Sequence, residues 1–424
     1  MLQAFDRLVL DPAKRWFRPF FTFTSAQTAA QVIGAITGII IVRNLTKQDY
    51  AFYTIANSVL SSLVVLADGS IGNALVGIGG QIWEDKHKLG QAIRAGLGIR
   101  AFIRNVFALP VLIVLVWLLW INGSGIAEII YLTPVVLLGA TLSLANGIYA
   151  VAPRLMGHVR LLQTITLAAA GFRLFLATVL AFLGLNAVSA MCVVLAGYLL
   201  QFLVSYSWTR RQVEIDLPAD PDVSNKLMAI IKRQIPNSLY YVLQSQIGIW
   251  LLSVFGTPDR VADLGALSRI SIIYVALLAA AENVLIPAYA RCRDPARLPI
   301  IYLQILASMV AISLIPILIT WIFPGPILWF LGPQYEQLPV ALLFATVAGM
   351  ISTINSTTYL LNTTRGWIPP PWIYISTSLG FQGLLLYVIG ASTIIEVLLV
   401  TIIFNLVQII VNIGGTLRLI IRLR

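Results

Sequence analysis

The sequence is poor in charged residues, which make up 11% of its 424 positions, whereas hydrophobic residues make up 59%. This balance lies outside the usual range of soluble proteins and excludes a chain built mainly of soluble domains. Cysteine is also scarce. Cys192 lies in an apolar run and Cys292 in a basic loop, so we expect neither a disulfide nor a cysteine metal site.

The net charge of +11 does not indicate a nucleic-acid partner. Its basic residues occur in short clusters between apolar runs, and no RNA-binding aromatic motif accompanies them. The cytoplasmic face of a membrane explains these clusters better, so membrane lipids are the expected partner. No motif indicates a cofactor.

Apolar runs of about 20 residues or more recur along the whole chain, and each is long enough to cross a bilayer as a helix. We therefore predict an all-α polytopic membrane protein with about twelve transmembrane helices. The predicted spans are residues 20–42, 51–79, 96–120, 126–150, 161–184, 187–208, 234–255, 264–289, 299–323, 339–361, 368–390 and 394–417. The first span lacks a small-residue cleavage site, so we expect a membrane helix and not a removed signal peptide.

The distribution of Lys and Arg predicts the orientation. Twelve spans place both chain ends on one side, and 23 of the 28 basic residues fall on that side. The other side has Arg43, Lys47 and Arg260. By the positive-inside rule, we expect both termini in the cytoplasm.

The loops predict how the chain is divided. The longest cytoplasmic loop separates an N-terminal lobe of six spans, residues 1–208, from a C-terminal lobe of six spans, residues 234–424, with residues 209–233 as the linker. The outer loops are short, which leaves no room for an external catalytic domain.

Two predicted helices have amide and hydroxyl side chains on one face. The first span carries Gln31, and the seventh carries Asn237, Tyr241 and Gln244. Amides in hydrocarbon need a partner, so these faces contact other helices or line a water-filled cavity. The same position in both lobes favours a cavity, and helix-to-helix hydrogen bonding is the alternative. The hydroxyl-rich second and tenth spans are weaker candidates for such a lining.

Two arginines lie inside predicted spans: Arg269 about 8 Å from the outer end of its span and Arg173 about 18 Å from the inner end, at 1.5 Å per residue. Because arginine keeps its charge, each needs an anion, a carboxylate or water, and both are candidate substrate-binding residues. Snorkelling of Arg269 and a structural pair for Arg173 are the alternatives. The candidate carboxylate partners are Asp68 and Glu282, and Glu282 is also a candidate ion-coupling residue.

Three further arginines, Arg94, Arg100 and Arg104, mark the start of the third span. They could attract a phosphate from the inner leaflet, and Arg104 is kept as a candidate substrate-binding residue. Positive-inside anchoring is the alternative for all three.

The segment VIGAITGIIIVRNLTKQDYAFYTIANSVLSSLVVLADGSIGNALV resembles the opening of polysaccharide and O-antigen (Wzx-like) flippases. In that family a helix ends in Arg-x-Leu before a short loop and an aromatic-rich second helix; the matching residues here are Arg43, Leu45 and Tyr50. Arg43 therefore joins the candidate substrate-binding residues. The seventh and eighth spans are similar to the same family at Pro236, Gly265, Arg269, Ile270 and Pro287.

This resemblance covers essentially the whole chain and implies the multidrug/oligosaccharidyl-lipid/polysaccharide (MOP) exporter superfamily. The implied fold is two six-helix bundles around a central cavity that opens alternately to the two sides. The implied cargo is an undecaprenyl-pyrophosphate-linked oligosaccharide, moved to the outer leaflet of the bacterial inner membrane for cell-surface polysaccharide biosynthesis. Polysaccharide polymerase and glycosyltransferases are the implied partners.

Two departures from the family pattern leave ion coupling open. The seventh span reads Ser245, Gln246, Ile247 and Gly248 where the family often has an acidic residue, and no Gly-Pro pair follows Leu45.

Three alternatives remain at this stage. A small-molecule or multidrug exporter of the same fold would bind cations through intramembrane carboxylates. A membrane polysaccharide polymerase or glycosyltransferase would need a carboxylate pair near the surface, and the outer acidic residues form no such constellation. A scaffold without cargo would leave the charges inside the spans without a role.

Overall fold

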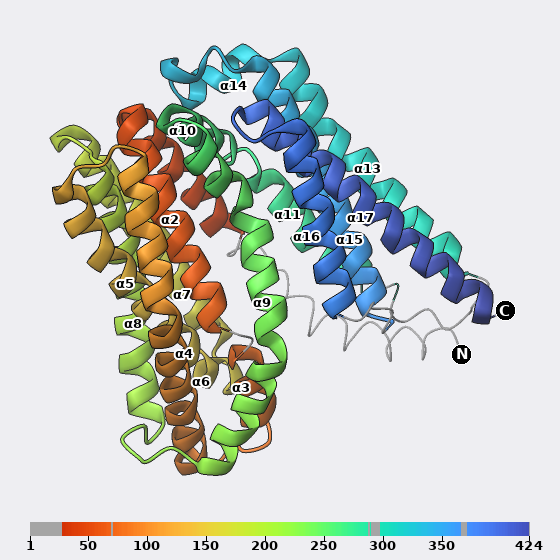
Figure 1. Cartoon of the computed structure of the whole chain (residues 1–424). Coiled ribbons are helices and arrows are strands. Elements are labelled where there is room, and N and C mark those ends of the chain that lie inside the picture. The colour runs from red at the N-terminus through yellow and green to blue at the C-terminus, as the bar shows by residue number, and fades with distance from the viewer. Residues whose placement is uncertain (1–27, 69–70, 287–288, 290–296, 366–370, 424) are drawn as a thin grey trace, which may run out of the picture. The chain divides into compact units, whose positions relative to one another are not determined.

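The structure is a computed structural model that describes residues 28–68, 71–286, 289, 297–365 and 371–423. These residues contain helices and no strand (Figure 1). Cys292 and Pro287 lie outside the described residues, so the predictions about them stay predictions.

The chain is a multi-pass membrane protein. Nine of the described helices are long and apolar enough to cross a membrane, and the number is ten if a bent pair counts as one span. The long helices are α2 (Lys47–Asp68), α4 (Lys86–Ile121), α5 (Ile126–Tyr149) with α6 (Val151–Leu155), α7 (Val159–Leu183), α8 (Ala187–Gln212), α9 (Pro221–Phe255), α13 (Leu298–Ile322), α15 (Pro339–Thr363) and α17 (Ile394–Leu423).

Shorter elements complete the described chain. The bent pair is α10 (Pro258–Leu267) and α11 (Ile272–Ala280). The others are α3 (Ile71–Gly79), a π-helical turn (Ala281–Leu285), α14 (Pro324–Leu331), η2 (Pro333–Tyr335) and α16 (Pro371–Ile389). The apolar helix Thr28–Asn44 overlaps the first predicted span, and Tyr374–Ile389, the apolar part of α16, lies within the eleventh. The count of twelve stays a prediction.

Local signals set the ends of the helices. α7 ends before Gly184, which has a φ of +102°, a conformation that glycine adopts without strain. The side chain of Asn186 accepts a hydrogen bond from the Ser189 amide at 2.8 Å, and the Ser189 hydroxyl accepts one from the Asn186 amide at 2.9 Å. This reciprocal cap starts α8, so three residues suffice to connect two long helices.

The described chain divides into two compact units that do not follow the order of the sequence. Of the described residues, unit 1 contains those in 28–41, 56–116 and 125–242, and unit 2 those in 42–55, 117–124 and 243–423. Two short segments from the first half of the sequence therefore pack with the second half. The predicted lobes, residues 1–208 and 234–424, have simple boundaries without this exchange, and the division into six and six spans stays a prediction.

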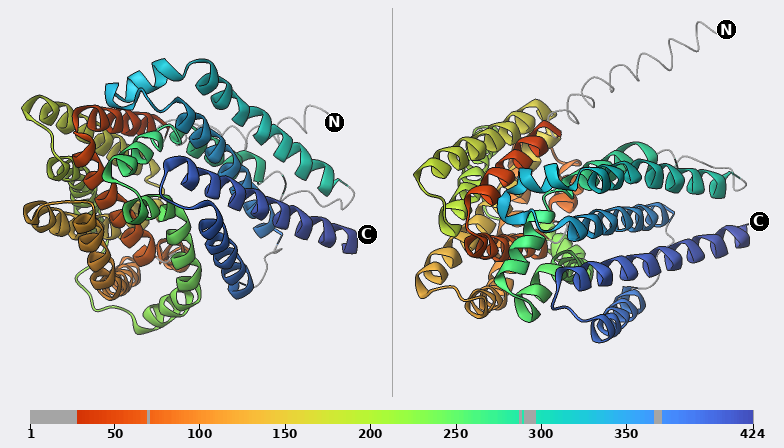
Figure 2. Two further views of the ribbon diagram at one scale, coloured as in Figure 1. Left: turned by 45° about the horizontal axis from the view of Figure 1, so that its top comes forward. Right: turned by 90° about the horizontal axis from the view of Figure 1, so that it is seen from above.

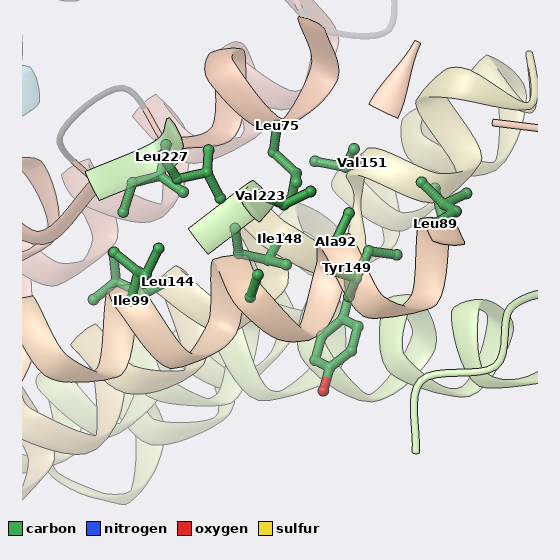
Figure 3. Packing of buried hydrophobic residues seen from close by; sticks show 14 of the residues in the cluster. Leu75, Leu89, Ala92, Ile99, Leu144, Ile148, Tyr149, Val151, Val223 and Leu227 are labelled. Carbon is green, nitrogen blue, oxygen red and sulfur yellow. The ribbon is translucent and has the colours of Figure 1, made fainter. Parts of the chain in front are cut away.

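The core of unit 1 joins the predicted linker to the helices before it. Leu75 of α3, Leu89 of α4 and Ile148 of α5 pack in one buried cluster with Val223 and Leu227 of α9 (Figure 3). α9 begins at Pro221, earlier than the predicted span, because the Asp220 carboxylate accepts the Asp222 amide at 2.8 Å and thereby caps the helix. The linker is thus partly helical and packed.

In unit 2, α15 lies between α13 and α17 (Figure 2, right). Amide and hydroxyl groups connect α15 to α17: Asn355 donates to the Asn405 side chain at 2.8 Å, Asn362 donates to the Asn412 carbonyl at 3.1 Å, and Thr416 donates to the Asn362 side chain at 2.6 Å. These polar residues of the tenth span, considered above as candidates for a cavity lining, make hydrogen bonds between helices. Such bonds satisfy groups that hydrocarbon would leave unpaired.

Candidate functional site

Arg269 lies at the break between two short apolar helices. α10 and α11 are bent by 42° relative to each other, and Arg269 lies in the turn that joins them. There the Arg269 amide donates to the Ala266 carbonyl and the Ile270 amide to the Leu267 carbonyl, both at 3.1 Å. These three-residue bonds form a tight 3₁₀ turn, a feature that often marks a functional hinge inside a helix.

Two tyrosines of α2, one helical turn apart, hold the Arg269 side chain. Its Nε donates to the hydroxyl of Tyr50 at 3.1 Å, and its guanidinium carbon lies 5.8 Å from the centre of the Tyr53 ring. Tyr50 is fully buried, whereas Arg269 is only partly buried. The guanidinium is therefore oriented by aromatic groups and still has N–H groups that can reach another acceptor.

No carboxylate pairs with Arg269 among the described residues. Tyr50 and Tyr53 provide an acceptor and a ring face, so they orient the charge without cancelling it. The same part of unit 2 contains a close approach of two helices at Gly265, where a Cβ would lie 2.6 Å from the Thr54 hydroxyl. Glycine at this position lets α10 pack directly on α2 beside the arginine.

The structure gives Asp68 a partner that the sequence did not indicate. The Asp68 carboxylate forms an ion pair with Arg100 of α4, and the Arg100 guanidinium also donates to the Leu144 carbonyl at 2.6 Å. Arg100 was interpreted above as a surface anchor or a group near the inner leaflet, and Asp68 as a partner for Arg173 or Arg269. Both interpretations are corrected, because Arg100 is buried inside unit 1 and occupies the carboxylate.

Glu282, the other candidate carboxylate, lies in the π-helical turn that follows α11 and is exposed. No ion pair involves Glu282 in the described part of the chain. The candidate eighth span thus has one charged residue in each of its two irregular turns, Arg269 in the first and Glu282 in the second. Irregular turns within helices are frequent at functional sites.

Arg173 lies in unit 1, on α7, and packs against α8. Its guanidinium carbon is 4.6 Å from the centre of the Tyr198 ring, and a Cβ at Gly197 would overlap its Nε. Nε and Nη2 are buried and have no hydrogen-bond partner among the described residues. Arg173 therefore has an aromatic partner, and the structural carboxylate pair considered above does not occur within the described residues.

The remaining candidate residues are dispersed. Arg104 donates to the Thr141 hydroxyl at 2.9 Å within unit 1, and Arg43 lies over the Trp329 ring at 4.7 Å within unit 2. Gln31 is partly exposed and Asn237 is exposed. Tyr241 is 62% exposed. Gln244 donates to the Gln382 side chain at 2.7 Å, so it makes the hydrogen bond between helices that was considered above as the alternative to a cavity lining.

The sequence analysis did not identify Tyr50 and Tyr53 as partners of Arg269. The family resemblance included Tyr50 without a role, and two tyrosines three residues apart do not by themselves indicate an arginine partner. In the part of the chain that the structure describes, no group of three or more His, Cys, Asp or Glu residues could hold a metal ion.

Comparisons with known proteins relate the chain to others through its fold. No family model matches the sequence, and no curated protein matches it. Among solved structures, an inward-facing multidrug resistance MATE family transporter of the MOP superfamily aligns with a TM-score of 0.70 at 17% identity, over 92% of this chain and 94% of that one.

Two further structures agree with this fold. An outward-facing multidrug resistance MATE family transporter has a TM-score of 0.60 at 19% identity, over 96% of both chains. A MOP superfamily transporter from Pyrococcus furiosus has a TM-score of 0.57 at 16% identity, also over 96% of both chains. At these identities the likeness establishes the fold and not the cargo. The chain has the fold of the MOP superfamily transporters.

Proposed function

We propose that this protein is a flippase that moves an undecaprenyl-pyrophosphate-linked oligosaccharide from the cytoplasmic to the outer leaflet by alternating access. The expected location is the bacterial inner membrane, with both termini in the cytoplasm. The observation that carries the proposal is Arg269, a cation at the break between α10 and α11, whose described partners are Tyr50 and Tyr53.

An arginine without a carboxylate partner suits an anionic ligand. A diphosphate headgroup offers several oxygens to the N–H groups of the guanidinium, and such charge-assisted bonds are stronger than neutral ones. The exposed Tyr241 and Asn237 offer hydroxyl, amide and ring contacts of the kind that a sugar chain needs. Lipid-linked sugar transport accounts for both kinds of group.

The membrane potential could supply the direction. With the cell interior negative, moving roughly two negative charges outward across about 100 mV is favourable by about 4 to 5 kcal/mol. This is enough to bias a carrier strongly without a coupled ion. The predicted seventh span, part of α9, has Ser245, Gln246, Ile247 and Gly248 where the family often has an acidic residue. The absence of a carboxylate at these positions is compatible with transport that needs no coupled ion.

A multidrug exporter is the second candidate, favoured by the likeness to multidrug resistance MATE structures. A cationic drug would need a free carboxylate in the transport path. In this chain Asp68 is paired with Arg100, so Glu282 is the one of the two candidate carboxylates that could take this role. The fold itself is no obstacle to another cargo, since the Pyrococcus furiosus transporter is described by a binding pocket of reverse polarity that suggests a different function.

The test is a flipping assay in vesicles with fluorescent undecaprenyl-pyrophosphoryl oligosaccharide. We expect wild type to move the lipid between leaflets at a rate that depends on the imposed potential. Arg269→Ala should slow the movement by about tenfold to a hundredfold, because losing a hydrogen-bonded charge costs about 1.5 to 3 kcal/mol.

Arg260→Ala is the matched control. Arg260 lies on α10, the helix that precedes Arg269, and its guanidinium donates to the Ser392 carbonyl at 2.5 Å. We expect this variant to flip lipid at close to the wild-type rate. If wild type moves no lipid-linked sugar under any potential or ion gradient, but exports a cationic dye, the multidrug candidate replaces the flippase.

A further inference from the structure

The turn after the first apolar helix packs against elements from the second half of the sequence. Residues 42–55 belong to unit 2, although they lie between two helices of the first half. Within unit 2 they contact α10 and η2. Any movement that separates the outer ends of the two sequence halves must therefore break these contacts.

The central contact is an ion pair at the start of α2. Lys47 Nζ lies 2.9 Å from Asp263 Oδ1, with 29% of the lysine side chain and 9% of the aspartate side chain exposed. The ammonium also lies 5.5 Å from the centre of the Tyr335 ring. Removing one member of a pair buried to this extent leaves the other charge poorly solvated, so it matters more than a surface pair.

The surroundings of Asp263 leave Lys47 as its one cationic neighbour among the described residues. Asp259 of the same helix repels the carboxylate, and Tyr335 of η2 packs beside it. Burial raises the pKa of Tyr335, so this phenol stays neutral and offers its ring to Lys47. The negative charge of Asp263 thus depends on Lys47 for compensation.

Two further contacts hold the same region. Gln334 Nε2 donates to the carbonyls of Val42 and Leu45, each at 3.2 Å, and so caps the end of the first apolar helix. In the other transferred segment, residues 117–124, the buried side chain of Asn122 donates to the Ser253 carbonyl of α9 at 3.0 Å. Both turns from the first half are therefore tied to the second half by side chains.

The ion pair lies next to the candidate site. Lys47 and Tyr50 are one turn apart on α2. Asp263 lies in the last turns of α10, and Arg269 follows the end of that helix by two residues. The ion pair between Lys47 and Asp263 and the hydrogen bond between Arg269 and Tyr50 therefore both connect the start of α2 to the C-terminal part of α10 and the turn after it. Separating these segments would break both contacts and release Arg269 from Tyr50.

We propose that Lys47 and Asp263 form the ionic latch of an outer gate, closed by the turns at residues 42–50 and 117–124. The gate rests on the alternating-access part of the proposed function and is independent of the cargo. Opening to the outside requires the latch to separate, and loss of either charge shifts the population toward the open state. The orientation that the positive-inside rule predicts would put Lys47 on the outer side.

The test measures access to a buried reporter from outside, without any cargo. Thr54→Cys, in a background with Cys192→Ser and Cys292→Ser, places a thiol at a buried position of α2 against Gly265. In right-side-out vesicles, we expect slow labelling by a membrane-impermeant maleimide. Lys47→Gln and Asp263→Asn should each raise the labelling rate about tenfold, because a change of 1.4 kcal/mol in the gate equilibrium is tenfold in population.

Three controls separate a latch from general damage. Lys47→Arg and the exchange of Lys47→Asp with Asp263→Lys should label at close to the background rate, because both retain opposite charges. Arg210→Gln, in the exposed Arg210 to Asp216 pair of unit 1, should leave labelling unchanged. Thermal unfolding of each purified variant shows whether it is folded.

Equal labelling of the reporter with and without the charges would overturn the latch, as would fast labelling of the charge-exchanged variant. If the latch variants behave as expected while no lipid-linked sugar is flipped, the gate stands and the proposed cargo fails. If lipid is flipped and labelling never changes, the cargo stands and the gate fails.

Discussion

Asp68→Ala is expected to lower the free energy of unfolding by about 3 kcal/mol, and Arg100→Met by only about 1 to 2 kcal/mol. The two residues form one ion pair, but their surroundings differ. The Arg100 side chain is 5% exposed and the Asp68 side chain 44% exposed. Removing Asp68 leaves a charge that water cannot reach, whereas removing Arg100 leaves a carboxylate that water can partly solvate.

The space around Arg100 explains why its guanidinium cannot relocate. A Cβ at Gly147 would lie 2.6 Å from Arg100 Nη1, and one at Gly72 would lie 3.2 Å from Nη2. The guanidinium thus fills the room left by two glycines on neighbouring helices. After loss of Asp68, it keeps the Leu144 carbonyl as an acceptor but has no counter-charge.

Thermal and denaturant unfolding of the purified variants in detergent would measure this asymmetry. Asp68→Asn is the informative third variant, because it preserves shape and one acceptor while removing the charge. It should fall between wild type and Asp68→Ala. Equal losses for Asp68→Ala and Arg100→Met, or a larger loss for Arg100→Met, would show that burial of the guanidinium does not determine the cost.

Gly90→Ala is expected to lower the free energy of unfolding by about 3 kcal/mol or more, or to release the segment that follows α8. Gly90 lies on the buried side of α4, where a Cβ would overlap the carbonyl oxygen of Glu214. A carbonyl of the main chain cannot rotate away as the end of a side chain can. The segment must therefore move, and the nearby packing of Val213 is lost with it.

Gly98→Ala is the matched control on the same helix. Nothing lies within 4 Å of a Cβ at Gly98, and the residue is exposed. Alanine there should be neutral or stabilise the helix by up to about 1 kcal/mol, because glycine is the poorer helix former. Unfolding measurements and limited proteolysis between residues 213 and 220 would compare the two variants. A Gly90→Ala protein as stable and as protease-resistant as Gly98→Ala would contradict the close approach.

The sequence by itself determined the class of the protein and the positions of nine candidate membrane helices. Each of the nine long helices overlaps a predicted span, because hydropathy over about 20 residues reports directly on the ability to cross hydrocarbon. Arg269 became a candidate from the sequence alone, since a charge inside an apolar run is visible without knowledge of its neighbours, and its role stays a prediction.

Only the tertiary structure decided the partners. Asp68 binds Arg100, 32 residues away, and Arg269 binds Tyr50, 219 residues away. The same holds for the amides of the tenth span. The sequence could not show whether they line a cavity or bond to a neighbouring helix, and the structure shows bonds to α17. Hydropathy depends on a residue and its neighbours along the chain, whereas pairing depends on which helices pack together and how closely. Glycines such as Gly147 set that closeness without leaving a distinctive pattern in the sequence.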